Sequence, residues 1–217
     1  MSNEPERPVE KNGRGDLFII SAPSGGGKTS LVNALLRRDP RLVLSISHTT
    51  RQPRPGENDG GHYHFVSEAD FRQMEDAGDF MEHARVFDHF YGTNRHSVAA
   101  QLEQDRDVIL EIDWQGARQV RTAFPQCCAI FIIPPSLETL RTRLTGRGQD
   151  STDVILRRMR DARAEISHWA EFDQLVVNDN FDTALEELAT IINDHRMGRS
   201  LKINKDYKHL AQQLGSS

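Results

Sequence analysis

Residues 17–31 read LFIISAPSGGGKTSL, and the organisation of the chain can be worked out from this segment. Its first four residues are apolar and predict a short buried strand. A glycine-rich turn follows, and Lys28 and Thr29 open a stretch whose apolar spacing predicts a helix. A strand, a glycine-rich loop and a helix in this order form the P-loop motif, which binds phosphate groups. The segment therefore predicts a phosphate-binding site at the end of the first strand.

The three glycines of this loop, 25–27, provide the backbone freedom that a phosphate cradle needs. Successive N–H groups can converge on one phosphate, and the helix start adds its dipole. Lys28 can then reach the terminal phosphates, and the Thr29 hydroxyl is placed to hold Mg²⁺. The motif usually begins with glycine, where this chain has Ala22. Alanine is the smallest substitute, so we expect a working loop rather than an ordinary tight turn.

Length and charge narrow the class of protein. With 217 residues the chain can form one substantial core. Its formal net charge of −5 argues against a general nucleic-acid binder, which would usually be basic. The first sixteen residues are polar and broken by prolines, unlike a signal peptide, and no apolar run reaches the ~18 residues of a membrane span. We expect a soluble, cytoplasmic protein without nucleic-acid or membrane partners, with a disordered tail over 1–15 and one domain over 16–217.

Cysteine and histidine usage argues against a disulfide and against a zinc site. Cys127 and Cys128 are adjacent in an apolar run. Neighbours in a strand point to opposite faces, so a bond between these two is not expected. The nine histidines show no metal-ligand spacing. Both features suit a protein of a reducing compartment.

Short apolar runs alternate with helical patterns along the chain. Strands are predicted at about residues 17–20, 42–46, 108–113, 129–133 and 175–177. Hairpin signals are lacking, so we predict an α/β fold with a central parallel sheet covered on both faces. Ligands should then bind at the carboxyl ends of the strands. Two minor expectations are that Tyr91–Thr93 turns the chain and that the residues from Ser200 onward are too weakly patterned to predict an element.

A second informative stretch, residues 47–65, reads SHTTRQPRPGENDGGHYHF. Arg51 and Arg54 lie on a proline-stiffened loop, with Tyr63 downstream. Two guanidinium groups fit a phosphate bidentately, and a tyrosine hydroxyl adds a donor. The alternative is a solvated basic loop, since the residue types alone allow either.

This stretch, together with FME at 80–82 and YGT at 91–93, closely resembles the guanylate kinase family. The resemblance extends from residue 16 to about 196, and the bacterial members are similar in DWQGARQVR, IPPSLETLRTRLTGRGQDS and HWAEFDQLVVNDNFDTAL. It implies a P-loop nucleoside monophosphate kinase fold, in which a central parallel sheet with helices on both faces carries a GMP-binding insertion and a lid. The parts implied are a core with its P-loop at 22–29, an insertion at about 47–94 and a lid at about 146–163.

The resemblance also implies the reaction and its residues. Members of the family transfer the γ-phosphoryl group of ATP to GMP, giving ADP and GDP, with Mg²⁺ as cofactor. The ATP site implied consists of Ala22, Pro23, Ser24, Gly25, Gly26, Gly27, Lys28, Thr29, Ser30, Arg147 and Arg158. The GMP site implied consists of Ser47, Arg51, Arg54, Tyr63, Glu82, Tyr91, Thr93 and Asp113. The catalytic residues implied are Lys28, Arg51, Arg147 and Arg158, with Thr29 as the Mg²⁺ ligand. ATP and GMP are then the partners, while acceptance of dGMP and formation of a homo-oligomer stay open.

The chemistry of the base agrees with this GMP site. Guanine presents an O6 acceptor beside two donors, N1–H and the N2 amino group. Glu82 can accept from both donors, while the hydroxyls of Ser47 and Thr93 can donate to O6. Adenine has an N1 acceptor and an N6 amino group, so it would oppose both sets. Without the resemblance, Glu82 would be interpreted as a surface carboxylate.

Two acids, Glu111 and Asp113, stand at the carboxyl end of the strand predicted at 108–113. Residues two apart on a strand share a face, and this end should lie beside the P-loop. One acid could hold a Mg²⁺ water while the other touches the guanine or the P-loop, and either could instead be solvated or cap the next helix. The family usually has aspartate where this chain has Glu111, so the separate roles stay open.

Seven arginines and only three acids occupy residues 141–163. Glycines interrupt this segment, and an arginine-rich segment with glycine hinges suits a lid that closes on a polyphosphate. Arg147 and Arg158 match the family's lid arginines. Others, such as Arg160 and Arg163, are expected on a solvated helix face with pairing to Asp161.

Two other functions are alternatives to this one. A guanylate-kinase-like module of a scaffold protein, which binds phosphorylated peptides without catalysis, resembles the GMP region but tends to lack a working P-loop. A nucleotide kinase with another acceptor, such as AMP or dTMP, would share the P-loop. The intact Gly27-Lys28-Thr29 counts against the first, and Glu82 with the SHTTR segment counts against the second.

Overall fold

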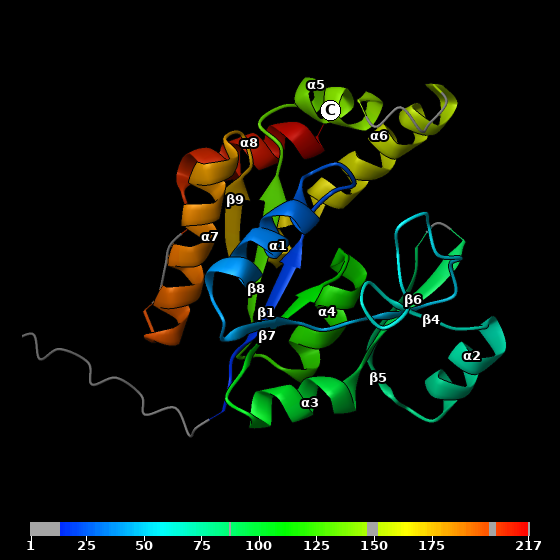
Figure 1. The fold of residues 1–217 in the computed structure, drawn as a ribbon. Coiled ribbons are helices and arrows are strands. Elements are labelled where there is room, and N and C mark those ends of the chain that lie inside the picture. The colour runs from blue at the N-terminus through cyan, green and yellow to red at the C-terminus, as the bar shows by residue number, and fades with distance from the viewer. Residues whose placement is uncertain (1–13, 87, 147–151, 200–202, 217) are drawn as a thin grey trace, which may run out of the picture.

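A five-stranded parallel sheet forms the centre of the structure (Figure 1). The structure is a computed structural model, and it describes residues 14–86, 88–146, 152–199 and 203–216. The strands of the sheet lie in the order β2, β7, β1, β8, β9. Their bounds are β1 Leu17–Ser21, β2 Leu42–Leu44, β7 Asp107–Glu111, β8 Cys128–Ile133 and β9 Gln174–Val177. Every neighbouring pair is parallel, so the predicted central parallel sheet is confirmed, and β1 with its P-loop lies in the middle.

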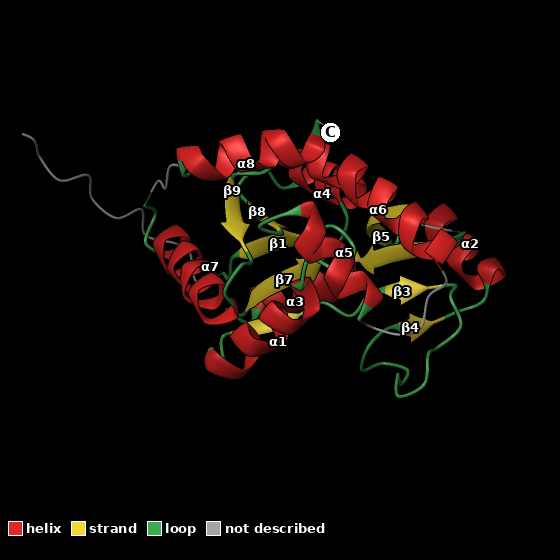
Figure 2. Ribbon diagram, turned by 90° about the horizontal axis from the view of Figure 1, so that it is seen from above, coloured by secondary structure: helices red, strands yellow, loops and turns green. Residues whose placement is uncertain are grey.

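Helices cover both faces of this sheet (Figure 2). Their bounds are α1 Lys28–Arg38, α3 Arg95–Glu103, α4 Trp114–Ala123 and α7 Phe181–Arg196. α1 and α7 pack on the face to which Phe18 points, whereas α3 and α4 pack on the face of Ile19. Cys127 and Cys128 join opposite faces as free thiols, which confirms the expectation of no bond between them. Over the described residues, no helix combines the length and apolar character needed to cross a membrane.

A second, four-stranded sheet lies beside the core, in the order β4, β3, β6, β5 (Figure 1). Its strands are β3 His48–Thr49, β4 His64–Phe65, β5 Phe80–Val86 and β6 His89–Asn94, accompanied by helix α2 Glu68–Asp76. β5 and β6 form an antiparallel hairpin. The expectation that hairpins are lacking is therefore wrong, and Tyr91–Thr93 lies within β6 rather than at a turn. The hairpin is hidden in the sequence because its connection has no glycine, and Asp88 takes the left-handed backbone instead, with φ of 97°.

Two further helices, α5 Leu137–Thr145 and α6 Thr152–Ser167, lie beyond the carboxyl ends of the central strands (Figure 1). They pack on each other through Leu140, Leu144 and Ala162. Residues 147–151, which include Arg147 of the predicted lid, lie outside the described residues, as do residues 1–13 of the predicted tail. α5 therefore ends where the predicted lid begins, and α6 contains the C-terminal part of the predicted lid.

The last helix, α8 Lys205–Gly215, corrects the sequence analysis, which predicted no element after Ser200. Its apolar residues at 207, 210, 211 and 214 recur at helical spacing, and Ala211 and Leu214 are buried in the core. A short helix with one narrow apolar face is unstable by itself and gains its stability from tertiary packing. The pattern was present in the sequence, but it was too narrow to stand out.

Candidate active site

The glycine-rich loop between β1 and α1 uses a backbone conformation that glycine adopts most readily. Gly25 and Gly27 have φ of 87° and 90°, in the left-handed region. Gly27 directly precedes Lys28, the first residue of α1. A Cβ on Gly27 would lie only 2.3 Å from Asn178 Nδ2. The shape of the loop therefore requires glycine here, as the P-loop motif predicts.

Asn178, which the sequence analysis missed, holds this loop in place. Its Nδ2 donates to the carbonyl oxygen of Gly26 over 2.8 Å. Its own carbonyl oxygen accepts from the Arg143 guanidinium on α5, also over 2.8 Å. Asn178 directly follows β9, and a polar residue at the carboxyl end of a parallel strand was the signal that could have identified it.

Glu165 on α6 is a second residue that the sequence analysis missed. Its Oε2 accepts a hydrogen bond from the backbone N–H of Ser24 in the P-loop, over 3.1 Å. Burial raises the pKa of Glu165 to about 7, while the nearby charge of Lys28 acts in the opposite direction. Nothing in the residue pattern distinguishes Glu165 from a solvated helix acid, so only the tertiary contact between α6 and the P-loop identifies it.

The end of β7 faces the P-loop, as the parallel order predicts. Glu111 pairs in register with Ile20 of β1, and its carboxylate accepts a hydrogen bond from the Thr29 hydroxyl. Lys28 Nζ lies 3.5 Å from the carbonyl oxygen of Ile112. A threonine hydroxyl beside a carboxylate offers the hard oxygen atoms that Mg²⁺ prefers.

Asp113 caps helix α4, one of the alternatives that the sequence left open. Its Oδ1 accepts from the backbone N–H of Gly116 over 2.9 Å, and its Oδ2 accepts from Gln115 Nε2 over 3.1 Å. The charge of Asp113 also contributes to raising the pKa of Glu82. The start of α4 therefore borders the predicted GMP site, while Glu111 is the acid that contacts the P-loop.

Glu82, Ser47 and Thr93 meet in one cluster, which we call the Glu82 cluster. Thr93 Oγ1 donates to Glu82 Oε1 over 2.6 Å, and Ser47 Oγ lies 3.3 Å from Thr93 Oγ1. Only 3% of Glu82 is exposed. Burial raises the pKa of Glu82 to about 7, although the hydrogen bond from Thr93 opposes the rise. Residue type alone predicted a surface carboxylate, and the structure contradicts that interpretation.

Replacing Glu82 with glutamine is expected to stabilise the protein more at pH 8 than at pH 5. The pKa of Glu82 is about 7 in the folded protein against an ordinary 4.5. Folding therefore favours the protonated form, so this group makes the wild-type protein less stable as the pH rises from about 4.5 to about 7. Glutamine does not titrate. Urea unfolding at both pH values measures the effect, and an equal difference in unfolding free energy at each would contradict the raised pKa.

The predicted phosphate-binding loop holds one of its two arginines against aromatic rings. The Arg51 guanidinium lies 5.4 Å from the centre of the Tyr63 ring, which contacts Tyr91 edge-on at 5.9 Å between centroids. Glu57, which the sequence analysis missed, accepts from Arg51 over 2.9 Å and from the backbone N–H of Arg54 over 2.7 Å. The Arg54 side chain is exposed. Of the two arginines, Arg51 is the one held in place.

The structure describes one of the two arginines that are predicted to act in the lid. Arg158 lies half-buried on α6, whereas Arg147 is outside the described residues. Asp161 pairs with Arg157, at 3.9 Å and four residues along the same helix. Arg160 lies exposed on a solvated face, as expected, and Arg157 is a partner of Asp161 that the sequence analysis did not name.

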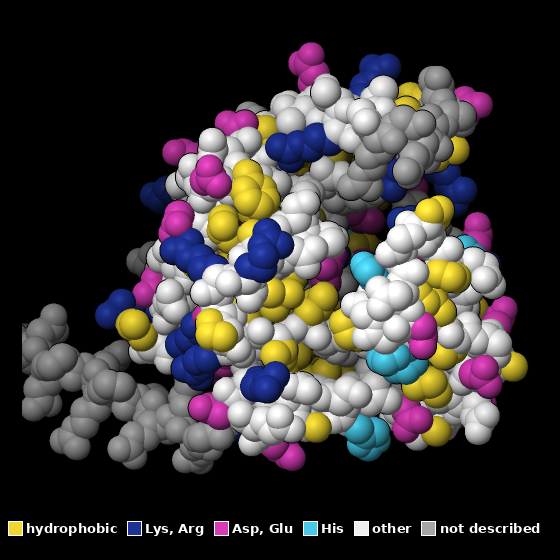
Figure 3. All heavy atoms as spheres, in the orientation of Figure 1, with side chains coloured by type: hydrophobic (Ala, Val, Ile, Leu, Met, Phe, Trp, Pro, Cys, Tyr) yellow, Lys and Arg dark blue, Asp and Glu magenta, His cyan; other side chains and the backbone are white. Residues whose placement is uncertain are grey.

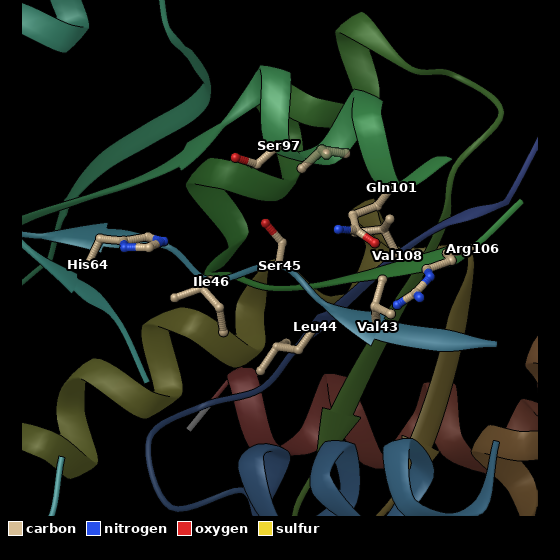
Figure 4. Close-up of a pocket in the computed structure, with 10 residues that line it drawn as sticks. Val43, Leu44, Ser45, Ile46, His64, Ser97, Gln101, Arg106 and Val108 are labelled. Carbon is tan, nitrogen blue, oxygen red and sulfur yellow. The ribbon is translucent and has the colours of Figure 1, made fainter. Parts of the chain in front are cut away.

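The surface is hollowed between the core and the second sheet, below the α5–α6 pair (Figure 3). α1 from the core and β6 from the second sheet flank this space (Figure 1). A separate cavity of about 200 Å³ lies between β2, α3 and β7, and its polar lining includes Ser45, Ser97 and Gln101 (Figure 4). None of the predicted site residues lines that cavity. The predicted site is therefore separate from that cavity.

A P-loop in the middle of a parallel sheet, with a buried hydrogen-bonding cluster on an adjoining sheet, defines a P-loop nucleotide-binding protein with a second polar site. A family model described as guanylate kinase matches residues 14–195. The chain therefore belongs to the guanylate kinase family.

Individual relatives agree over most of the chain. A guanylate kinase of Alkalilimnicola ehrlichii is 59% identical over 187 residues, which are 85% of this chain and 92% of that protein. One of Nitrosococcus oceani is 58% identical over 200 residues, which are 92% of this chain and 98% of that protein. The crystal structure of guanylate kinase from Anaplasma phagocytophilum is similar with a TM-score of 0.72 at 32% identity, covering 85% of this chain and 87% of that one.

Proposed function

We propose that the chain divides two substrates between the halves of its site, with ATP on the P-loop and GMP on the Glu82 cluster. The chain phosphorylates GMP at the expense of ATP: the γ-phosphoryl group passes to GMP, giving ADP and GDP. The observation that carries the assignment of the halves is Glu82, a buried carboxylate hydrogen-bonded to Thr93 within reach of Ser47.

The Glu82 cluster has the hydrogen-bonding groups that guanine requires. The carboxylate of Glu82 accepts from N1–H and from the N2 amino group, and the hydroxyls of Ser47 and Thr93 donate toward O6. Thr93 donates to Glu82 in the structure, which holds the acceptor carboxylate and the hydroxyl donors next to each other. Asp113, at the start of α4, lies beside the Glu82 cluster and completes the GMP site there.

The phosphate of GMP is bound by the loop that carries Arg51 and Arg54. Arg51 is already oriented by Glu57 and by the Tyr63 ring. This preorganisation lowers the conformational entropy cost of ordering its side chain when the phosphate binds. Arg54 is exposed and free to swing onto the phosphate, and the hydroxyls of Tyr63 and Tyr91 add donors. The loop thus aims a phosphate oxygen of GMP toward the P-loop.

On the ATP side, the backbone of residues 22–30 cradles the phosphates and Lys28 neutralises their charge. Thr29 and Glu111 fit Mg²⁺, because their side-chain oxygens already meet. When bound, the ion offsets negative charge on the phosphates. A phosphate oxygen of GMP is anionic, so the protein needs no general base, and its work is to position the substrates and exclude water.

Residues 47–94 are then a GMP-binding insertion and residues 146–163 a lid, whose Arg147 and Arg158 bind phosphates on closure. The helix pair α5–α6 at the carboxyl edge of the sheet and the bond from Ser24 to Glu165 support a lid joined to the P-loop. The enzyme would act in the cytoplasm, in purine nucleotide metabolism.

An assay coupled to ADP release, with ATP and Mg²⁺, tests the proposal across GMP, dGMP, AMP and dTMP. GMP should exceed AMP and dTMP by orders of magnitude in kcat/KM, while the result with dGMP decides whether the 2′-hydroxyl is recognised. Comparable turnover of AMP would contradict the assignment of the Glu82 cluster to guanine. No turnover with any acceptor, together with binding of a phosphorylated peptide, would instead favour a scaffold module.

A further inference from the structure

The strand that carries Glu82 lies at an open edge of its sheet. β5 pairs with β6 on one side, and no other strand among the described residues pairs with its second side. The register of the hairpin also shifts between Phe80 and Glu82, and such an irregularity re-aims side chains. A residue of an edge strand presents its N–H and its C=O to the same side, where they need partners. The backbone next to Glu82 therefore depends on something outside the sheet.

A side chain of the core provides those partners. Gln119 Nε2 on α4 donates to the carbonyl oxygen of His83 over 2.8 Å, and Gln119 Oε1 accepts from the backbone N–H of His83 over 3.2 Å. A glutamine amide offers one donor face and one acceptor, as a peptide group does. Gln119 thus makes the pair of hydrogen bonds that a neighbouring strand would make with His83.

One turn before Gln119, α4 also shapes the space around Glu82 itself. Gly116 leaves that space open, because a Cβ there would lie only 2.4 Å from Glu82 Oε2. Asp113 holds Gly116 in place, because Asp113 Oδ1 accepts a hydrogen bond from the backbone N–H of Gly116 over 2.9 Å. The first turns of α4 therefore contact both the Glu82 carboxylate and the backbone of the next residue.

The same helix is tied to the P-loop. Ile112 and Asp113 connect the end of β7 to the start of α4, and Lys28 Nζ lies 3.5 Å from the carbonyl oxygen of Ile112. A helix that contacts β5 and follows the segment in contact with Lys28 links the position of the Glu82 carboxylate to that of the P-loop lysine. Transfer between two bound substrates depends on such positioning, and a displacement of about 1 Å can lower a rate by ~10²-fold.

We propose that Gln119 is a positioning residue for the choice of base: it fixes the β5 backbone on α4 and so holds the Glu82 carboxylate toward guanine. The inference rests on the proposed role of Glu82. It assigns a part in GMP selection to a residue that touches neither substrate, through two hydrogen bonds to a main chain.

Gln119→Met tests the inference, because methionine keeps the length and the helix propensity of glutamine but removes both hydrogen bonds. The expected result is a fall of ~10-fold or more in kcat/KM for GMP and a smaller GMP-to-AMP ratio, with the KM for ATP unchanged. Thr122→Ala is the matched control, since Thr122 lies exposed on the same helix and its hydroxyl bonds only within it, to Arg118. Tm is measured for every variant.

A double-mutant cycle with Glu82→Gln separates positioning from a general structural role. If Gln119 acts through Glu82, then Gln119→Met should change the GMP-to-AMP ratio little once Glu82 is already glutamine. Additive effects, or a wild-type ratio in Gln119→Met, would overturn the inference. If Gln119→Met unfolds below the assay temperature, Gln119→Glu carries the same test, because it keeps an acceptor for the His83 N–H and loses the donor.

The cycle also distinguishes the inference from the function on which it rests. If Glu82→Gln itself leaves the GMP-to-AMP ratio unchanged, the proposed role of Glu82 is wrong, whatever Gln119→Met does. If Glu82→Gln lowers the ratio and Gln119→Met does not, the role of Glu82 stands and the inference about Gln119 alone fails.

Discussion

Lys28→Ala is expected to lower kcat for GMP phosphorylation by at least ~10²-fold, about the effect of removing one preorganised donor from an active site. Lys28 starts α1 directly after the left-handed Gly27, and its ammonium group reaches the carbonyl oxygen of Ile112, the residue that follows β7. No other lysine lies in the P-loop, so alanine would leave the phosphates without this charge as negative charge shifts during transfer.

The ADP-release assay at saturating ATP and GMP measures this effect. Lys205→Ala is a matched control, because Lys205 is also the first residue of a helix but is exposed on α8. The control should keep wild-type turnover and both variants should keep the wild-type Tm within a few degrees. Near-normal turnover in Lys28→Ala would remove this lysine from the mechanism and revive the interpretation as a non-catalytic binding module.

The second large effect is expected on the choice of base, where Glu82→Gln should erode the preference for GMP over AMP. A buried carboxylate that faces the N1 acceptor of adenine loses its partners, and leaving buried polar groups unpaired costs more than a poor apolar fit. Sites built on such hydrogen bonds reject the wrong partner by roughly 10⁴-fold, against about 10²-fold for shape alone. Glutamine can turn its amide donor toward adenine N1 while it offers guanine only one acceptor.

Values of kcat/KM for GMP and AMP, together with the KM for ATP, measure this prediction. The loss should fall on the GMP reaction and spare ATP, since Glu82 lies on β5 and the P-loop on the central sheet. Glu68→Gln, an exposed carboxylate on the neighbouring helix α2, is the control and should change neither. An intact GMP-to-AMP ratio in Glu82→Gln would mean that the base is recognised by other residues.

Local signals in the sequence were sufficient to predict the P-loop and the central sheet. The strand, glycines and lysine of residues 17–31 predicted the P-loop, because the glycine conformations and the helix start depend on residues next to one another. Alternating apolar runs predicted the parallel sheet for the same reason. The Glu82 cluster was predicted only through the family resemblance, since a single glutamate in a strand carries no local sign that it is buried.

The tertiary structure decided what depends on distant partners. Asn178 lies 152 residues from Gly26, Glu165 lies 141 residues from Ser24, and Gln119 lies 36 residues from His83. The open edge of β5 and the helix α8 also depend on distant partners, because both are stabilised by contacts with elements far away in the sequence. Hydrogen bonds and burial across such separations exist only after the sheet and its helices assemble, so the sequence shows them weakly, as for α8, or not at all, as for Glu165. The sequence by itself thus determined the P-loop and the sheet that carries it, whereas the fold decided which polar side chains hold the two halves of the site in register.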